Sequence, residues 1–288
     1  MNKIQLPAYD DAGAFVSLSN NHRLGSYPFL KGLVGSVQAS YTQYLGVNGL
    51  PALVQNPPVS AAVANFLKGH YKSPPKDLAY ITKMRESTEH LTCPMCGSMH
   101  SGTLDHYLPK SGFPNFSVFS MNLIPACNCN SKRKETLTGT NAHERVLHPY
   151  FDACLGERLV RANFDDLGDV PRVSIVLMIS NTHPNYPAIS FHVQSIVQKS
   201  AIQNYQADRW SSLFRKPGLV IHAFKNNVAT QVEVENILEQ ERESLDDLHK
   251  GKNNWNSIFV SGLLQPPVVT WLTARLSAPD RQPNSALA

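Results

Sequence analysis

The spacing of apolar residues divides the chain into three parts, of which the first is helical. Between residues 28 and 45 apolar side chains recur at helical spacing, and Gly46 follows as a stop signal, so we expect an amphipathic helix there. Two further helices are predicted to begin at Asn56-Pro57 and Ser73-Pro74 and to end near Leu67 and Glu86. We interpret the Tyr and Leu residues of this part as core.

The second part, from Cys93 to about Tyr150, has no regular period. Gly, Pro, Asn and Ser interrupt it at short intervals, which is typical of a small module organised by a metal ion. Within it, TLDHYLPK indicates a short strand entering a turn, SMNLIPAC a second approach to the cysteines, and NSKRK the beginning of a helix.

In the third part regular structure resumes. Stretches rich in β-branched and aromatic residues, bounded by turn residues, predict strands at 158–164, 172–180, 188–193 and 219–224. Helices are expected at about 195–215, 230–250, 255–264 and 267–276. We expect the final segment to be a loose tail.

These elements predict an α+β fold in which a small metal-stabilised module lies between an N-terminal helical region and a C-terminal α+β region. The predicted boundaries are 1–89, 90–152, 153–276 and a tail at 277–288. With 288 residues, 42% of them hydrophobic, the chain can bury a substantial core.

Composition narrows the class of protein only slightly. The formal net charge of +4 allows a nucleic-acid partner without requiring one. The sequence shows neither a secretory signal nor an apolar run of membrane-spanning length, so we expect a cytoplasmic protein with no membrane partner. The predicted helix at 230–250 carries many acids, which repel phosphates; solubility explains them better than docking of a partner protein does.

Four of the five cysteines form two close pairs. In a reducing cytosol, Cys93 with Cys96 and Cys127 with Cys129 are better explained as ligands of a structural Zn²⁺ than as disulfides. The second pair has one intervening residue instead of two, which leaves open whether Cys127 binds the ion. We interpret Cys154 as a small buried hydrophobic residue.

A zinc ion joining the two pairs would bring Asp105 and His106 close to Asn130. The carboxylate of Asp105 and the amide oxygen of Asn130 suit Mg²⁺ or Mn²⁺. His106 could take a proton from an attacking water. The basic run Lys132, Arg133 and Lys134 could hold a phosphate.

The ordered combination of these residues resembles the HNH nucleases of the ββα-metal class. The order is Cys-x-x-Cys, Asp-His with Pro109 and Lys110 behind it, Asn122-Leu123, and then Cys-Asn-x-Lys, which begins at Cys129. The resemblance covers roughly residues 90 to 150. It implies Asp105 as a metal ligand, His106 as the general base, Asn122 as the residue that fixes the turn and orients His106, and Asn130 as the second metal ligand, where the family often has His.

A longer stretch, LDHYLPKSGFPNFSVFSMNLIPACNCNSK with HPYFD at 148–152, also resembles the HNH subunits of bacterial antiphage systems of the Septu type, including those attached to retrons. Such subunits work with an ABC-type ATPase. The resemblance therefore implies a nuclease effector of DNA or RNA with an ATPase partner, and it extends to a retron reverse transcriptase and its nucleic acid as further partners.

Other residues and functions stay open at this stage. His143, His148 and Tyr150 could line the same cleft, although hydrogen-bonded structural roles are commoner for such residues, and His100 is expected in an exposed turn. The alternative function is a zinc-knuckle scaffold that binds nucleic acid or protein without cleavage. A degenerate nuclease fold that only assembles a complex is a third. The presence of Asp105, His106, Asn122 and Asn130 in nuclease order favours the enzyme.

Overall fold

The computed structural model describes residues 1–87 and 92–288. The expected boundary at residues 89 and 90 lies outside these residues. In chain order the helices and strands are α1 (Asp11–Asn20), α2 (Val34–Gly46), α3 (Ala61–Lys72), α4 (Ala79–Glu86), β1 (Thr103–His106), β2 (Leu123–Ala126), α5 (Cys129–Lys132), β3 (Val160–Asp165), β4 (Arg172–Leu177), α6 (Tyr186–His192), α7 (Ile202–Arg215), α8 (Gln231–Leu248), α9 (Trp255–Leu263) and α10 (Pro266–Leu276).

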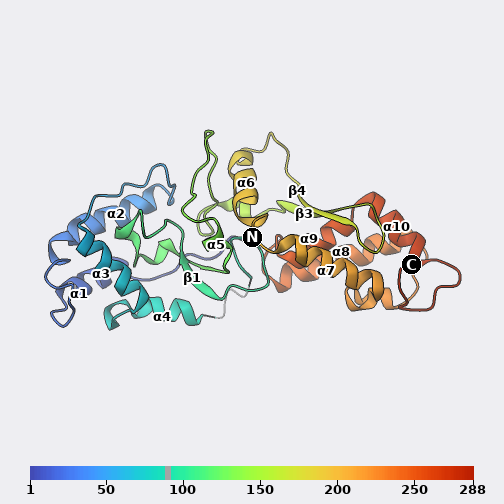
Figure 1. Cartoon of the computed structure of the whole chain (residues 1–288), viewed down its shortest axis with the longest axis horizontal. Coiled ribbons are helices and arrows are strands. Elements are labelled where there is room, and N and C mark those ends of the chain that lie inside the picture. Colours follow the sequence, from blue (N-terminus) through green and yellow to red (C-terminus); the bar gives the residue numbers. More distant parts are fainter. Residues whose placement is uncertain (88–91) are drawn as a thin grey trace.

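The molecule is elongated, with helices at both ends (Figure 1). Helices α1 to α4 gather around β1 at one end, and α7 to α10 lie with β3 and β4 at the other. The chain's N-terminus, α5 and α6 lie between the two ends. The expected α+β composition, with a cysteine cluster able to hold a metal ion, is therefore present.

The N-terminal helices begin where side chains cap them. Asp10 accepts a hydrogen bond from Gly13 N at 2.9 Å and begins α1, which the sequence analysis did not predict. Ser60 accepts from Val63 N at 3.3 Å, so α3 begins there and not at Pro57. It also continues beyond the predicted end at Leu67 to Lys72. The longer α3 matters because its last turn reaches the strand β1.

Strands β1 and β2 form an antiparallel pair, with Thr103 opposite Ala126 and His106 opposite Leu123, and α5 follows directly. The long connection between the strands is held by aromatic packing against α2. Tyr41 stacks on Phe119 with ring centroids 4.0 Å apart, and Tyr44 packs against Phe116 at 5.2 Å. This connection is therefore part of the core although it has little regular structure.

In the C-terminal half, the antiparallel pair β3–β4 lies against α7 and α9. Phe164 of β3 packs against Trp210 of α7, with ring centroids 4.7 Å apart. Gly262 brings α9 close to β3, since a Cβ there would lie 2.7 Å from Ala162 O. A side chain at residue 262 would therefore push the helix off the strand.

Two of the predicted strands are helical turns. Residues 188–193 lie mostly in α6, which has Pro187 in its first turn and buries Ile189 and His192 one turn apart. Residues 219–224 lie in and between two 3₁₀ turns. Both stretches are short and rich in apolar residues, and such runs do not distinguish a strand from a helix by periodicity.

The segment 277–288, expected to be loose, is docked. Leu287 N donates to Phe214 O at 2.8 Å, and Asn284 Oδ1 accepts from Gly218 N at 2.9 Å. Leu287 is buried. The tail prediction is therefore wrong for these residues, because the Leu287 main chain bonds to α7 and the Asn284 side chain bonds to the main chain just after α7.

No single helix in the described ranges has the length and apolarity of a membrane span. Helices α9 and α10 reach that length only together, and they are bent by 78° relative to one another.

Candidate metal centre and adjoining cleft

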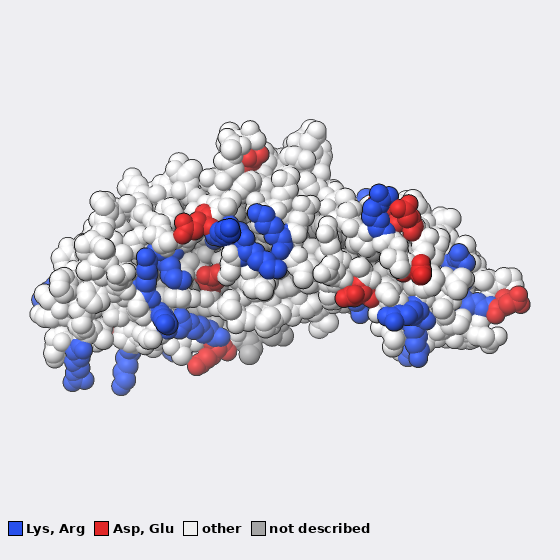
Figure 2. Space-filling view, in the orientation of Figure 1, with Lys and Arg blue, Asp and Glu red and all other residues white. Residues whose placement is uncertain are grey.

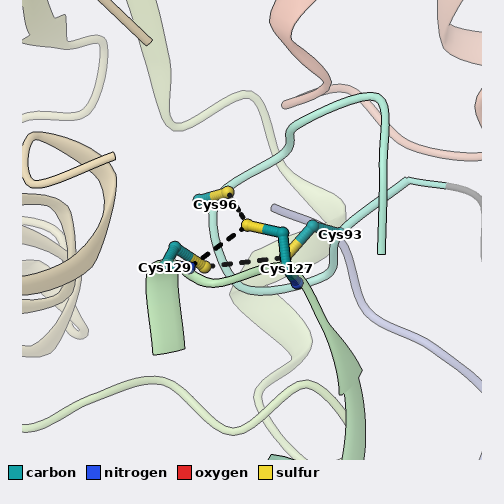
Figure 3. Close-up of side chains that lie close together, drawn as sticks. All are labelled: Cys93, Cys96, Cys127 and Cys129. Carbon is teal, nitrogen blue, oxygen red and sulfur yellow. Dashed lines mark hydrogen bonds between the residues drawn. The ribbon is translucent and has the colours of Figure 1, made fainter. Parts of the chain in front are cut away.

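Four sulfur atoms converge at the centre of the molecule. Figure 3 shows Cys93 and Cys96 in a turn before β1, Cys127 after β2, and Cys129 at the beginning of α5. All four Sγ atoms lie within 4.8 Å of one another. The Cys93–Cys129 and Cys96–Cys127 separations are 3.7 and 3.5 Å. Tetrahedral zinc–thiolate bonds of about 2.3 Å place sulfurs about 3.8 Å apart, so the cluster can hold Zn²⁺.

The turn that carries the first pair requires glycine at residue 97. Gly97 has φ +82°, and its N–H donates to Cys93 O at 2.8 Å. A Cβ there would lie 2.0 Å from Asn253 O. The turn is therefore fixed both by its own hydrogen bond and by a segment far along the chain.

Main-chain N–H groups of the second pair donate to sulfur atoms of the cluster. Cys127 N donates to Cys93 Sγ at 3.4 Å, and Cys129 N donates to Cys127 Sγ at 3.3 Å. Hydrogen bonding from Cys129, followed by that from Cys93 and Cys96, lowers the pKa of Cys127 below its ordinary value. Both cysteines of the short pair therefore face the cluster, and the spacing of one residue does not turn Cys127 away.

Distant segments clamp the turn at 93–97 from several sides. Trp255 Nε1 donates to Cys96 O at 2.8 Å, and His192 Nε2 lies 2.7 Å from Met95 O. The amino group of Met1 donates to Asn253 O at 2.6 Å. The cysteine cluster therefore lies where the N-terminal residues, α6 and the beginning of α9 meet.

A cleft of about 290 Å³ opens beside the metal centre. Strand β1 places Asp105 and His106 in it, and α5 supplies Asn130. These three predicted site residues are thus brought together. The fourth, Asn122, lies behind the cleft.

His106 is buried, and its imidazole is held by one nitrogen only. Nε2 lies 2.9 Å from Ser117 O, while Nδ1 has no hydrogen-bond partner among the described residues. Because a carbonyl oxygen only accepts, the hydrogen of the neutral ring is assigned to Nε2. Nδ1 therefore has a free lone pair, 3.8 Å from Asp105 Oδ1.

Asp105 is ionised and partly exposed. Burial opposes its ionisation, but hydrogen bonds from His106 and Asn130 outweigh burial and hold its pKa below the ordinary value. Its Oδ1 accepts from His106 N and its Oδ2 from Asn130 Nδ2, both at 2.8 Å. The cleft therefore contains a fixed carboxylate that keeps its charge at neutral pH.

Asn122 joins the two ends of the β1–β2 connection. Its Oδ1 accepts from Leu108 N at 2.7 Å, and its Nδ2 donates to Leu108 O and Phe116 O, both at 3.1 Å. Phe116 is followed by Ser117, whose carbonyl holds His106. These bonds connect the residues just after β1 to the segment that carries Ser117.

Asn130 and Arg133 do not have the geometry expected of a free metal ligand and a phosphate-binding cation. Asn130 Oδ1 accepts from Arg133 Nε at 2.7 Å, so the oxygen proposed as a ligand already has a partner. Arg133 is 2% exposed and donates to His106 O at 3.1 Å and Tyr107 O at 2.5 Å. Arg133 lines the cleft, but its guanidinium group is bonded to main-chain carbonyls and is almost inaccessible to solvent, unlike a cation on an exposed basic surface.

The remaining predicted cations divide between the cleft and the outer surface. Lys110 and Lys134 line the cleft, whereas Lys132 is exposed and does not line it. Figure 2 shows Lys and Arg side chains on both halves of this face, including a group over the half that carries β1 and α5. Helix α5 ends at Lys132, and Lys134 lies in a turn with φ +56°, so the three consecutive side chains have different surroundings.

The histidines considered at 143 and 148 have different surroundings. His148 is buried, its Nε2 lies 2.9 Å from Tyr44 Oη, and burial lowers its pKa well below the ordinary value. Tyr150 donates to Leu123 O at 2.7 Å. His143 lines a separate cavity, and His100 is exposed as expected. None of these residues lines the cleft at Asp105.

Several residues around the cleft were not predicted from the sequence. Lys68 lines it from α3, and Ser111 and Glu135 line it from the segments after β1 and α5. The Tyr71 ring of α3 contacts the His106 ring with centroids 4.2 Å apart. Sequence spacing gave no signal for the α3 residues, because they lie more than thirty positions before Asp105.

Comparison with known proteins adds one partial similarity. The chain is 37% identical to the protein Ea31 of Escherichia phage lambda over 76 residues, which are 25% of this chain and 26% of the phage protein. No family model matches the chain. No solved structure matches it. The similarity is confined to about a quarter of each protein and assigns no activity.

Proposed function

We propose that this protein is a metal-dependent endonuclease of the HNH kind that hydrolyses phosphodiester bonds of DNA or RNA. The observation that carries the proposal is the unpartnered Nδ1 of His106 beside the ionised carboxylate of Asp105 in an open cleft. The strand–strand–helix order of β1, β2 and α5, next to four converging cysteines, also supports it.

The chain's own groups can perform the proton transfer that such hydrolysis needs. Ser117 O keeps the hydrogen of His106 on Nε2, so Nδ1 accepts the proton of a water molecule in the cleft. Asn122 holds the connection that carries Ser117, which keeps the imidazole oriented. Lys110 and Lys134 supply positive charge for the phosphate.

The residues fit a divalent cation only in part. Asp105 offers an ionised, partly exposed oxygen of the kind that Mg²⁺ or Mn²⁺ prefers. Such an ion would supply charge neutralisation for the phosphate. Asn130 does not fit as its second ligand in this arrangement, because Arg133 occupies its oxygen. We therefore assign Asn130 to orienting Asp105, through the 2.8 Å hydrogen bond from its Nδ2.

The bond between Asn130 and Arg133 also favours a second candidate function. If no second ligand is free, the protein could act as a zinc-knuckle scaffold that binds nucleic acid or protein without cutting it. The two functions differ in what His106 does, since a scaffold does not need a free imidazole nitrogen in a cleft.

We further propose that the nuclease is the effector of a bacterial antiphage complex and acts with an ABC-type ATPase. Phosphate contacts carry no sequence information, so a free nuclease of this kind would endanger host nucleic acid. The net charge of +4 favours only weak unaided binding. Expressed in its native host, the protein should co-purify with the ATPase; a free monomer that cuts at full rate would contradict this partnership.

The test of the nuclease proposal is cleavage of plasmid DNA, single-stranded DNA and tRNA with and without Mg²⁺ or Mn²⁺. His106→Ala should lower the rate by about 100-fold to 10,000-fold, because general-base removal has that effect. His143→Ala is the matched control, since His143 is exposed and lies outside the cleft. Cleavage by His106→Ala within a few-fold of wild type would exclude His106 as the base. No cleavage by the wild type in any condition would favour the scaffold.

A further inference from the structure

Helix α3 forms one side of the cleft, although it lies outside the segment that resembles HNH nucleases. Lys68, in the second half of α3, lines the cleft together with Asp105 and His106. Its side chain is half-buried, and in residues 1–87 and 92–288 it has no hydrogen-bond or ion-pair partner. A lysine side chain without a partner at an open cleft is available to an anion.

The position of α3 is fixed by its next turn. Tyr71 Oη donates to Leu104 O, and the Tyr71 ring packs edge-on against His106 with an interplanar angle of 63°. These contacts of Tyr71 hold the end of α3 against β1, and Lys68, one turn earlier, lines the cleft. The helix is thus joined to the residues on either side of Asp105.

The charges around the cleft favour a phosphate strand. Lys68, Lys110 and Lys134 come from three separate segments and surround the position of Asp105. Arg85 and Lys110 also lie over the Tyr71 ring, 4.7 and 5.2 Å from its centroid. Cations that converge from separate elements match the successive charges of a nucleic-acid backbone.

We propose that Lys68 binds a non-bridging oxygen of a phosphate next to the scissile one, so that the N-terminal helical region is a wall of the substrate site. This inference rests on the proposed function only in taking the substrate to be nucleic acid. Lys72, one turn later on α3, is exposed and does not line the cleft. It therefore provides a control with the same charge on the same helix.

The experiment measures binding of fluorescein-labelled single-stranded and duplex oligonucleotides by fluorescence anisotropy over a series of salt concentrations. The protein carries His106→Ala, so that bound substrate is not consumed. Lys68→Gln should raise Kd and reduce the slope of log K against log salt by about 0.7 for single strands and about 0.9 for duplex. Lys72→Gln should leave the slope of log K against log salt unchanged. Lys68→Arg keeps the charge and should bind the oligonucleotides as tightly as the protein that retains Lys68.

The outcomes separate this inference from the nuclease proposal. If Lys68→Gln and Lys72→Gln bind alike, Lys68 does not contact phosphate, whether or not the wild type cleaves. If Lys68→Gln alone loses affinity while the wild type cleaves nothing, the phosphate site stands and the nuclease proposal fails. If neither oligonucleotide binds at low salt, or Lys68→Arg loses as much affinity as Lys68→Gln, the inference is overturned.

Discussion

Replacing Cys127 with serine tests whether the cluster binds zinc through four thiolates or three. The one-residue spacing of the second pair leaves this open in the sequence, but the structure places Cys127 Sγ 3.5 Å from Cys96 Sγ and within 4.8 Å of the other sulfurs. We therefore expect Cys127→Ser to lower zinc content as much as Cys93→Ser or Cys96→Ser does. A serine hydroxyl is a poor substitute because zinc in such sites is bound by ionised sulfur.

The expected loss of stability in Cys127→Ser follows from mass action. Loss of a group that only supports a ligand already lowers metal affinity by about 10-fold to 100-fold. Loss of a ligand itself should therefore lower zinc affinity by at least about 100-fold. With free zinc well above Kd, a hundredfold rise in Kd removes about 2.7 kcal/mol of stability. At about 2–4 °C per kcal/mol for chains near this size, Tm should fall by roughly 5 to 10 °C.

The assay is native mass spectrometry for bound zinc together with thermal unfolding in buffered zinc. Cys154→Ser is the matched control, because Cys154 is buried but lies outside the cluster. Its zinc content should equal that of the wild type. Full zinc occupancy and an unchanged Tm in Cys127→Ser would refute a four-thiolate site, and absence of zinc from the folded wild type would refute the metal centre altogether.

Two further predictions concern the support of the cleft. Asn122→Ala should lower the unfolding free energy by on the order of 3 kcal/mol in urea denaturation, because it leaves buried main-chain groups of Leu108 and Phe116 unpaired; exposed Asn128→Ala is the control, and equal stabilities would contradict the role of Asn122. Burial raises the pKa of Asp11 from 3.8 to about 6, against hydrogen bonds from Ser120. Between these values the folded state holds a proton that the unfolded state has lost, so stability should fall as pH rises from about 4 to about 6, and Asp11→Asn should remove this component of the pH dependence. An identical pH profile for Asp11→Asn and the wild type would refute the raised pKa.

The C-terminal helices could be predicted from the sequence because local signals specify them. Helix α8 begins at Thr230, whose side chain accepts from Glu233 N while the Glu233 side chain accepts from Thr230 N. Helix α10 has proline in its first turn. Each lies within a few residues of its predicted range.

The short apolar segments could not be assigned in this way. Residues 188–193 and 219–224 were predicted as strands from their composition, but what decides between strand and helix is whether a partner strand is available. Among the described residues β3 and β4 pair only with each other. The hydrophobicity of a segment indicates that it is buried, whereas its tertiary neighbours determine its conformation.

In the candidate site too, the contacts within the motif could be predicted from the sequence, whereas the contacts with the rest of the chain could not. The motif places Asp105, His106 and Asn130 together, because they follow from one strand pair and the helix after it. The motif does not reveal that Arg133 is buried or that α3 supplies Lys68. Both facts depend on how the module packs against the rest of the chain, which residue spacing within the module does not encode.

The short helix α5 joins the metal centre to the cleft. Its first residue, Cys129, faces the sulfur cluster, and the next, Asn130, donates to Asp105 Oδ2 and His106 O. Arg133, one turn later, donates to the same His106 carbonyl and to Asn130. A helix of four residues has too few internal hydrogen bonds to keep its own conformation. Zinc bound at Cys129 would therefore fix α5, and through α5 the carboxylate and imidazole on β1, so loss of a cysteine ligand should impair the cleft together with the fold.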